Sequence, residues 1–394
     1  MIDKPLLIAV MTLLTFSLVM DYSLSVYTVQ HFGYGEFHFF IRQITAVFAG
    51  LLAMIVLSRL DPEKWFAPVG FSLFIPFFIV MIMMWFLPAS LVSEVGGAKR
   101  WIHLGSLSIA PVEFFKVGFV FFLAWSFNRK LGNKEQMDFA EEIQMFTPYL
   151  TIFLFAVILI AVFQKDLGQV VVLGATLMTL FLFVGSSYKF FFMLLSTAFV
   201  GILALIFFVP HRMARIKSWW ITIQDSVLSL LPFKPVQSLR VETALKEPWQ
   251  FSNSLNAIHS GGIWGQGLGN GQFKLGYLSE VHTDFVLAGI TEELGFLGLF
   301  ATVLAILFVI FRIFRIASKV QNAMYYLFSI GVGLLIAYAF ILNAYGISGI
   351  MPIKGIAVPF LSYGGSHILA MCIAIGMVLM ISKKIPRDMH GNIL

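Results

Sequence analysis

Long apolar runs separated by short polar or glycine-containing stretches dominate the chain. Segments of about 17–25 predominantly apolar residues, the length a helix needs to cross ~30 Å of hydrocarbon, recur along the whole sequence. The pattern predicts an all-α polytopic membrane protein with about ten transmembrane helices. We place these helices at residues 5–24, 38–57, 66–87, 111–127, 147–163, 168–185, 189–209, 284–311, 323–345 and 357–381.

Composition supports the same fold class. The 394 residues are 59% hydrophobic and 12% charged, with a mean hydropathy of +0.90, which leaves too little polar surface for a soluble globule. The loop at about 210–283 is too short and too polar for an independent core, so we predict one membrane domain over residues 1–394. The net charge of +6 comes without a soluble basic domain, which argues against a nucleic-acid partner.

Basic residues predict the orientation. With the amino terminus inside, thirteen of the 26 Lys and Arg residues fall on the inner side and six in short outer segments or outer helix ends. The other seven belong to the long loop, which the positive-inside rule discounts. We therefore expect both termini to be cytoplasmic.

In this topology, the unusual polar segments all lie on the outer side. They are residues 96–105, 164–168, the long loop and 354–366. ATP is absent from that side, and the sequence has no Gly-x-x-x-x-Gly-Lys-Ser/Thr phosphate loop. Any chemistry there must use a substrate that arrives already activated.

The long loop contains two patterned segments. Apolar residues at spacings of three and four oppose a basic face, which predicts an interfacial amphipathic helix that either anchors the loop or attracts anionic headgroups or a diphosphate. The apolar residues are Met213, Ile216, Trp220, Ile223, Val227 and Leu230, and the basic ones are Arg212, Arg215 and Lys217. The glycine-rich residues 261–271 lack the strand context of a dinucleotide site. They form either an anion-binding nest or a turn without a ligand.

Two further places carry charges at helix ends. Glu113 and Lys116 are three residues apart on one predicted helix and should pair. The pair either locks helices together or shapes a substrate cavity. Asp166 precedes the sixth predicted span, where a helix cap is one role and a site residue another.

The densest group of ionisable residues surrounds the start of the eighth span. Thr283 is expected to cap that helix, which places Asp284 in its first turn, where the dipole favours an ionised carboxylate. Asp284 is then either an N-terminal helix acid or a general base. Its neighbours are Glu280, His282, Glu292 and Glu293.

These motifs together resemble the SEDS family of bacterial cell-wall polymerases, which includes FtsW, RodA and SpoVE. The resemblance covers nearly the whole chain. It rests on Gly97-Ala-Lys-Arg-Trp-Ile102, Pro111-Val-Glu-Phe-Phe-Lys116, Gln164-Lys-Asp-Leu-Gly168, His282-Thr-Asp-Phe285, Glu292-Glu-Leu-Gly295 and Pro359-Phe-Leu-Ser-Tyr-Gly-Gly-Ser366. Residues 267–271 and 248–250 favour the FtsW-like branch.

The resemblance implies a peptidoglycan glycosyltransferase that polymerises lipid II in the bacterial cytoplasmic membrane, during division or cell-shape maintenance. Asp284 matches the catalytic aspartate, the proposed acceptor of the proton from the acceptor sugar, and undecaprenyl diphosphate is the leaving group. Lys99 and Arg100 are candidates for the diphosphate. Further substrate-site candidates are Glu113, Lys116, Asp166, His282, Thr283, Ser362 and Ser366.

The resemblance also implies partners, and physical reasoning adds a cofactor. We expect lipid II, the nascent glycan, a class B penicillin-binding transpeptidase and other membrane proteins of the division or elongation machinery. A divalent cation, Mg or Mn, could share the diphosphate, although no ligand spacing here is diagnostic of a metal site.

Five positions depart from the family pattern and leave the fine substrate contacts open. They are Val112, Lys165, His259, Lys354 and His367. Two other functions fit the same topology: a flippase or transporter of a lipid-linked precursor, because charged residues within spans also mark transport pathways, and a non-catalytic scaffold of the division machinery.

Overall fold

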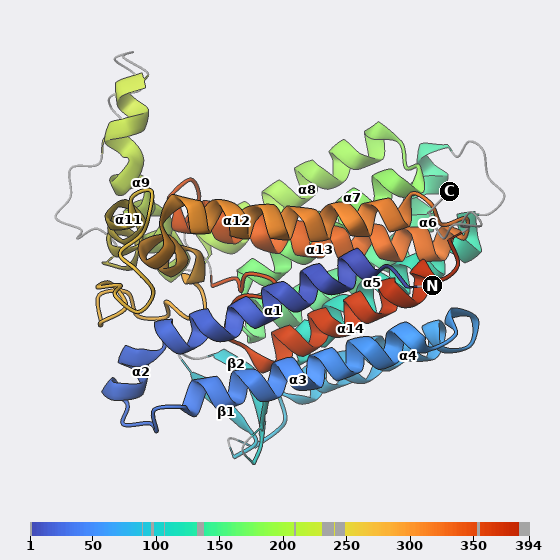
Figure 1. The fold of residues 1–394 in the computed structure, drawn as a ribbon. Helices are drawn as coiled ribbons and strands as arrows, with labels where there is room; N and C mark the ends of the chain where they lie inside the picture. Colours follow the sequence, from blue (N-terminus) through green and yellow to red (C-terminus); the bar gives the residue numbers. More distant parts are fainter. Residues whose placement is uncertain are drawn as a thin grey trace.

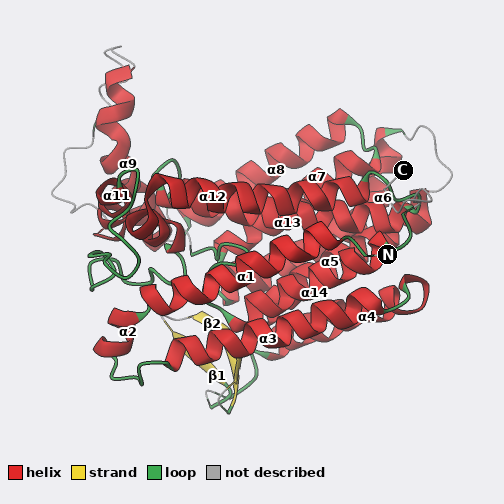
Figure 2. Cartoon of the chain, in the orientation of Figure 1, coloured by secondary structure: helices red, strands yellow, loops and turns green. Residues whose placement is uncertain are grey.

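The structure is a computed structural model in which a helical bundle carries a small sheet at one end (Figure 1, Figure 2). It describes residues 2–88, 90–95, 98–105, 107–131, 138–208, 210–230, 240, 249–352 and 355–385. The helices are α1 (Lys4–Leu24), α2 (Val26–His31), α3 (His38–Arg59), α4 (Pro62–Met83), α5 (Pro111–Leu131), α6 (Phe139–Val157), α7 (Leu167–Val184), α8 (Tyr188–Phe207), α9 (Pro210–Leu230), α11 (Trp249–Gly261), α12 (Val286–Ala317), α13 (Ala323–Ile347) and α14 (Gly365–Ser382). A π-helical turn, η1 (Ile158–Phe163), continues α6.

Within the described residues, nine helices are long and apolar enough to span a membrane. The one predicted span outside these nine is the fourth, 111–127. It forms α5, whose first turns carry Glu113 and Lys116, and these charges lower its hydropathy. Helix α5 packs against α4, α7, α13 and α14, and the side chains from Pro111 to Phe121 are buried. The fold class predicted from the sequence is therefore confirmed, with α5 sheltered inside the bundle.

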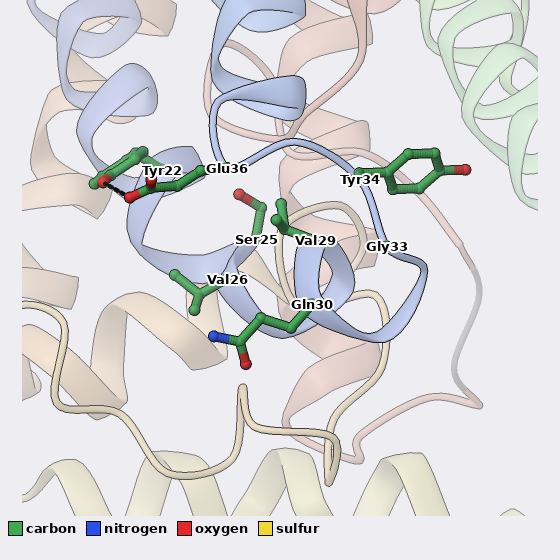
Figure 3. Close-up of a pocket in the computed structure, with 8 residues that line it drawn as sticks. All are labelled: Tyr22, Ser25, Val26, Val29, Gln30, Gly33, Tyr34 and Glu36. Carbon is green, nitrogen blue, oxygen red and sulfur yellow. Dashed lines mark hydrogen bonds between the residues drawn. The ribbon is translucent and has the colours of Figure 1, made fainter.

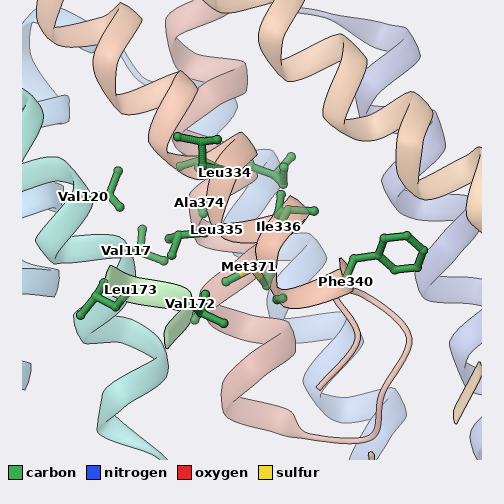
Figure 4. Packing of buried hydrophobic residues seen from close by; sticks show 14 of the residues in the cluster. Val117, Val120, Val172, Leu173, Leu334, Leu335, Ile336, Phe340, Met371 and Ala374 are labelled. Carbon is green, nitrogen blue, oxygen red and sulfur yellow. The ribbon is translucent and has the colours of Figure 1, made fainter. Parts of the chain in front are cut away.

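The core lies around α14 and α13. Of the residues of α14, 83% are buried, against 11% in the apolar window of α8. Figure 4 shows Val117 of α5, Leu173 of α7, Leu335 of α13 and Met371 of α14 converging in this layer. An apolar helix in a membrane can be covered by lipid or by other helices, and α13 and α14 are covered mainly by other helices.

Segments predicted to lie on the outer side gather at one end of the bundle, which we call the outer end after that prediction. Figure 1 places α2, β1, β2, α9 and α11 together, opposite the chain termini. At the other end, the backbone N–H of Asp3 donates to Ser382 Oγ at 3.1 Å, and the Arg312 guanidinium pairs with the Asp3 carboxylate in a buried ion pair. Both described ends of the chain therefore lie on the same side of the bundle.

The outer end also contains a sheet that the hydropathy pattern did not predict. Strands β1 (Val92–Val95), β2 (Ala98–Leu104) and β3 (Leu107–Ile109) form an antiparallel sheet in the order β1-β2-β3. The strands are short and lie between two spans, where helix-length apolar runs give no signal. The predicted motif residue Gly97 lies outside the described residues, as does Lys354.

Helix α9 runs across the axis of the bundle at its outer end (Figure 1), which is the direction that the amphipathic pattern predicts for an interfacial helix. The Trp219 indole N–H anchors it by donating to the Gly349 carbonyl at 2.8 Å. Residues 231–239 and 241–248, including Pro248 of the predicted branch motif, lie outside the described part of the chain.

Two predicted helix starts were wrong by eight residues. Helix α6 begins at Phe139, eight residues before the predicted start of its span at 147. Helix α14 begins at Gly365, eight residues after the predicted start of the last span at 357. Pro359 and Gly364 lie in the intervening apolar segment, and neither favours a continuous helix. That segment is instead a loop at the outer end of the bundle.

Candidate active site at the outer end of the bundle

The turn that carries Asp284 is held by its backbone. The Asn343 amide of α13 donates to the carbonyls of Asp284 and Ile356, each at 2.7 Å. Ser362 Oγ donates to the Thr283 carbonyl at 2.6 Å, and the Tyr363 N–H donates to the His282 carbonyl at 2.9 Å. The loop before α14 therefore fixes the position of the Asp284 turn, and Ser362 acts through the backbone.

The Asp284 side chain is half-buried and faces Gly355. A Cβ atom at Gly355 would lie 2.6 Å from Asp284 Oδ2, so any larger residue there would displace the carboxylate. Burial, together with the negative charges of Glu280 and Asp166, raises the pKa of Asp284 to about 7, and the positive charge of Arg100 offsets part of this rise. A carboxyl group with a pKa near neutrality can both accept and release a proton.

The predicted helix cap at Thr283 was wrong. Helix α12 begins at Val286 after Phe285, with no side-chain cap. Thr283 Oγ1 instead donates within its own turn, to the Glu280 carbonyl at 3.1 Å and to Glu280 Oε2 at 2.9 Å. Asp284 consequently precedes the first helical turn, and burial is the largest cause of its raised pKa.

Arg100 organises the turn before α7. Its Nε donates to the Gln164 carbonyl at 2.9 Å, and its NH2 group donates to the Lys165 carbonyl at 3.0 Å. Its NH1 lies 3.9 Å from Asp166 Oδ2. Asp166 accepts from the Gln169 N–H at 3.2 Å, so the predicted cap of α7 is confirmed. Burial raises the pKa of Asp166, and the positive charge of Arg100 offsets part of this rise.

Lys99 and Arg100 do not form a joint clamp. Successive residues of a strand point to opposite faces, and Lys99 Nζ lies over the Trp85 ring, 5.7 Å from its centroid. Lys99 remains half-exposed, whereas the Arg100 guanidinium already contacts two carbonyls. Both residues were predicted as candidates for contacts with the diphosphate, and the sequence did not show that two backbone carbonyls would contact the Arg100 guanidinium.

Glu113 joins three helices beneath the site. Its carboxylate lies 3.0 Å from Lys116 Nζ and 2.7 Å from His367 Nδ1 of α14. Gln169 of α7 bridges the pair, because its amide donates to Glu113 at 3.1 Å and accepts from Lys116 at 2.6 Å. All four side chains are buried. This network supports the locking role proposed from the sequence for Glu113 and Lys116.

Ser366 and His282 complete the surroundings. Ser366 Oγ accepts from the Ala110 N–H at 2.9 Å and so joins the segment after the sheet to α14. His282 is buried against the rings of Phe39 and Tyr363, and burial lowers its pKa to about 4. The imidazole is therefore neutral at neutral pH.

The glycine-rich loop is a nest for the protein's own carboxylates. Glu293 accepts from the Gly269 N–H at 3.1 Å and from Lys274 Nζ at 2.6 Å, and Ser23 of α1 donates to the same carboxylate at 2.7 Å. Glu292 accepts from the N–H groups of Gln272 and Phe273. These donors are thus already used, which argues against the phosphate nest that the glycines suggested.

The same loop occupies a break in α12 at Gly295, where φ is 70° and ψ −171°. The N–H groups of Gln266 and Gly267 donate to the carbonyls of Glu292 and Glu293, both at 2.9 Å. Sequence reasoning missed this role of Glu292 and Glu293. The Gly295 that follows them was the available signal, because a glycine inside a helix indicates a packing or backbone reason.

In the described part of the chain, three residues other than glycine have positive φ angles, and all three lie in the segments around Asp284. They are Lys165 at 52°, Glu280 at 34° and Phe360 at 65°. Such conformations are uncommon and cluster at functional sites, where the surrounding structure imposes them. Their distribution supports a site here.

The metal prediction has little support in the side chains. Within the described residues, no group of three His, Cys, Asp or Glu residues could hold a metal ion. Asp166 and Asp284 are two carboxylates close enough to interact, whereas Mg²⁺ takes six oxygen ligands, several of them water or phosphate. Any such ion would depend on the substrate for most of its ligands.

Comparisons with known proteins agree along the whole chain. The family model for FtsW, RodA and SpoVE, described as cell cycle protein, matches residues 4–386. A probable peptidoglycan glycosyltransferase FtsW of Helicobacter pylori is 49% identical, covering 97% of this chain and 98% of the relative. The stage V sporulation protein E of Bacillus subtilis is 31% identical, covering 97% of each chain.

Solved structures agree in fold. A chain of a peptidoglycan synthase complex, described as coordinating polymerization and crosslinking, superimposes with a TM-score of 0.71 at 20% identity, covering 98% of this chain and 99% of that one. The rod shape determining protein RodA of Thermus thermophilus gives a TM-score of 0.63, also at 20% identity, covering 98% of each chain.

Proposed function

The chain belongs to the FtsW, RodA and SpoVE family of cell cycle proteins, and from this premise we propose that it is a peptidoglycan glycosyltransferase that polymerises lipid II. The observation that carries the proposal is the Asp284 carboxyl group. It is half-buried at the outer end of the bundle, and its pKa is raised to about 7. It is therefore able to act as a general base at neutral pH.

In the proposed reaction, the 4-hydroxyl oxygen of the acceptor sugar attacks C1 of the donor glycan chain. Asp284 accepts the hydroxyl proton as the new glycosidic bond forms. The bond from C1 to the diphosphate oxygen breaks, and undecaprenyl diphosphate leaves with the bonding electrons. The energy comes from the substrate, which agrees with an outer site that has no ATP.

The leaving diphosphate needs positive charge nearby. Lys99 is half-exposed, and Arg100 lies close enough to Asp284 to lower its pKa. We assign Arg100 chiefly to positioning, because it holds residues 164–166, and Lys99 to the substrate. A divalent cation that arrives with the diphosphate would add charge at the same place.

The location of the protein follows from the same premise. It is a multi-span membrane protein, and we place it in the bacterial cytoplasmic membrane with the Asp284 end outside and both termini inside. Its proposed partner is a class B penicillin-binding transpeptidase, which would cross-link the strands. The peptidoglycan synthase complex that shares the fold supports such a pairing.

The test is polymerisation of purified lipid II by the detergent-solubilised protein with its cognate transpeptidase. Asp284→Asn keeps the size of the side chain and removes the base, so we expect a loss of at least about a hundredfold in rate. Asp138→Asn, at an exposed position preceding α6, is the matched control and should retain activity.

Each result decides between functions. Long glycan chains from wild type and Asp138→Asn, with none from a folded Asp284→Asn protein, support the proposal. Equal activity of Asp284→Asn would place the base elsewhere. If wild type with a competent partner makes no polymer, the transporter or the scaffold is the better explanation.

A further inference from the structure

Aromatic rings from the segment after α2, from the start of α3 and from the loops before α12 and α14 form a connected series. Tyr34 stacks on His38 with ring centroids 4.4 Å apart and meets Phe39 edge-on at 5.7 Å. Phe39 in turn contacts the rings of His282 at 5.1 Å and Tyr363 at 5.2 Å. The series therefore connects the exposed segment after α2 with His282, two residues before Asp284.

A cavity of about 420 Å³ lies where this series begins (Figure 3). Its walls include Tyr22, Ser25, Val26, Val29, Gln30 and Glu36. Tyr22 OH donates to Glu36 Oε1 at 3.4 Å on one side, and Figure 3 shows Gln30 on the other side, with the two valines between them. The volume falls within the range of about 300–1,000 Å³ for small-molecule sites.

The lining fits a neutral amino sugar. An aromatic face accepts the C–H face of a pyranose ring, while a carboxylate and an amide can bond its hydroxyl and N–H groups. Val26 and Val29 offer an apolar wall for an acetyl methyl group. Among the described residues that line the cavity none is Lys or Arg, so a diphosphate or an anionic headgroup would lack a counter-charge there.

The lining argues equally against a hydrocarbon chain. Lipid tails offer no hydrogen-bond partner, so a tail in this cavity would desolvate the Glu36 carboxylate and the Gln30 amide without compensation. Gln30 is exposed at the rim, which keeps its amide free to bind a polar ligand. The chemistry therefore selects a saccharide over the acyl chains of the surrounding membrane.

We propose that this cavity is a second saccharide subsite, which binds an N-acetylhexosamine unit of the glycan strand beside the Asp284 site. The inference rests on the proposed function and adds to it a place where the strand is held away from the reacting bond. A polymerase with such a subsite retains its product between additions and makes longer strands.

The experiment measures binding of the β-1,4-linked tetramer of N-acetylglucosamine to the full-length protein in nanodiscs, in the Asp284→Asn background so that turnover plays no part. Gln30→Ala combined with Glu36→Gln removes two polar contacts, and we expect binding about tenfold weaker. Val26→Phe fills the cavity without changing these polar groups and should also weaken binding, by at least as much. Gln321→Ala, at an exposed position at the opposite end of the bundle, is the matched control with unchanged affinity.

In the polymerisation assay, the variants of the cavity should make shorter strands than wild type. Equal affinity and equal strand length for all variants, or a tetramer site that phospholipid displaces, would overturn the subsite. The proposed function can fail separately. If wild-type protein binds the tetramer through Gln30 and Glu36 but makes no polymer, the saccharide subsite is supported and the polymerase function is not. Unfolding temperatures equal to that of wild type show that the variants are folded.

Discussion

Asp284 combines two requirements of a general base, access to the substrate and a pKa near the working pH. Because an acid with a raised pKa loses its proton only near neutrality, polymerisation should rise with pH to a plateau above pH 7. At pH 6, a single group with a pKa of about 7 is about one-tenth ionised, which predicts a rate about tenfold below the plateau. Rate measurements between pH 5.5 and 8.5 test this, and a flat profile would exclude Asp284 ionisation as the controlling step.

The same shift has a consequence for stability. An Asp whose folded pKa is raised above its unfolded value destabilises the folded state once the pH exceeds the unfolded pKa, and this cost increases until the pH passes the folded value of about 7. Asn carries no such cost. Asp284→Asn should therefore raise the unfolding temperature more at pH 8 than at pH 5, measured on the same preparations.

The Glu113 carboxylate neutralises the charge of Lys116 in the buried network. Glu113→Gln would leave Lys116 charged and buried without its partner, for which we expect a loss of about 3–5 kcal/mol in the free energy of unfolding. The matched control is Glu63→Gln, because the Glu63–Lys384 pair is exposed, with side chains 68% and 41% accessible, and exposed pairs contribute about 0–1 kcal/mol. Comparable losses in denaturant titrations of the two variants would contradict a structural role for the network.

At the scale of elements, the break in α12 depends on Gly295. A Cβ atom there would lie 2.3 Å from the Ile263 carbonyl oxygen, and the φ of 70° disfavours any other residue. Gly295→Ala should cost at least about 1–3 kcal/mol and loosen the glycine-rich loop. Limited proteolysis of that loop and thermal unfolding measure both effects.

Gly201 provides the comparison for that variant. It lies within α8, and a Cβ atom there meets no other atom within 4 Å. Gly201→Ala should therefore be neutral or stabilise the protein by up to about 1 kcal/mol, as alanine does in a helix interior. A similar loss for both glycine variants would indicate a general intolerance of α-helical substitutions and not a special break at Gly295.

Hydropathy predicted elements well where helices cross the bundle, because a run of apolar residues leaves few alternatives in a membrane. Helix α3, for example, begins at His38 as predicted. Hydropathy gave the wrong element for residues 357–364, where apolar residues are buried by protein and not by lipid. It also gave no signal for the short strands. Local sequence also could not show that Arg100 would meet carbonyls 64 residues away, since that contact depends on how two loops pack.

At the scale of the whole molecule, the orientation has a direct test. The one cysteine, Cys372, is buried, so new cysteines can be labelled individually. An impermeant maleimide should label Trp264→Cys, at a position 80% exposed at the glycine-rich end, in intact spheroplasts. It should reach Gln321→Cys only after the membrane is opened. The reverse labelling pattern would place Asp284 on the cytoplasmic side of the membrane. It would contradict the proposal that lipid II is polymerised on the outer side.

The buried ion pair between Asp3 and Arg312 joins two residues that are made at very different times during biosynthesis. Asp3 leaves the ribosome 309 residues before Arg312 and 379 residues before Ser382. Helix α1 is therefore made long before α12, one of the helices against which it packs. Helix α14, the most buried of the nine apolar spans, is the last of the described helices to be made. The bundle can therefore close only after this core helix has been translated.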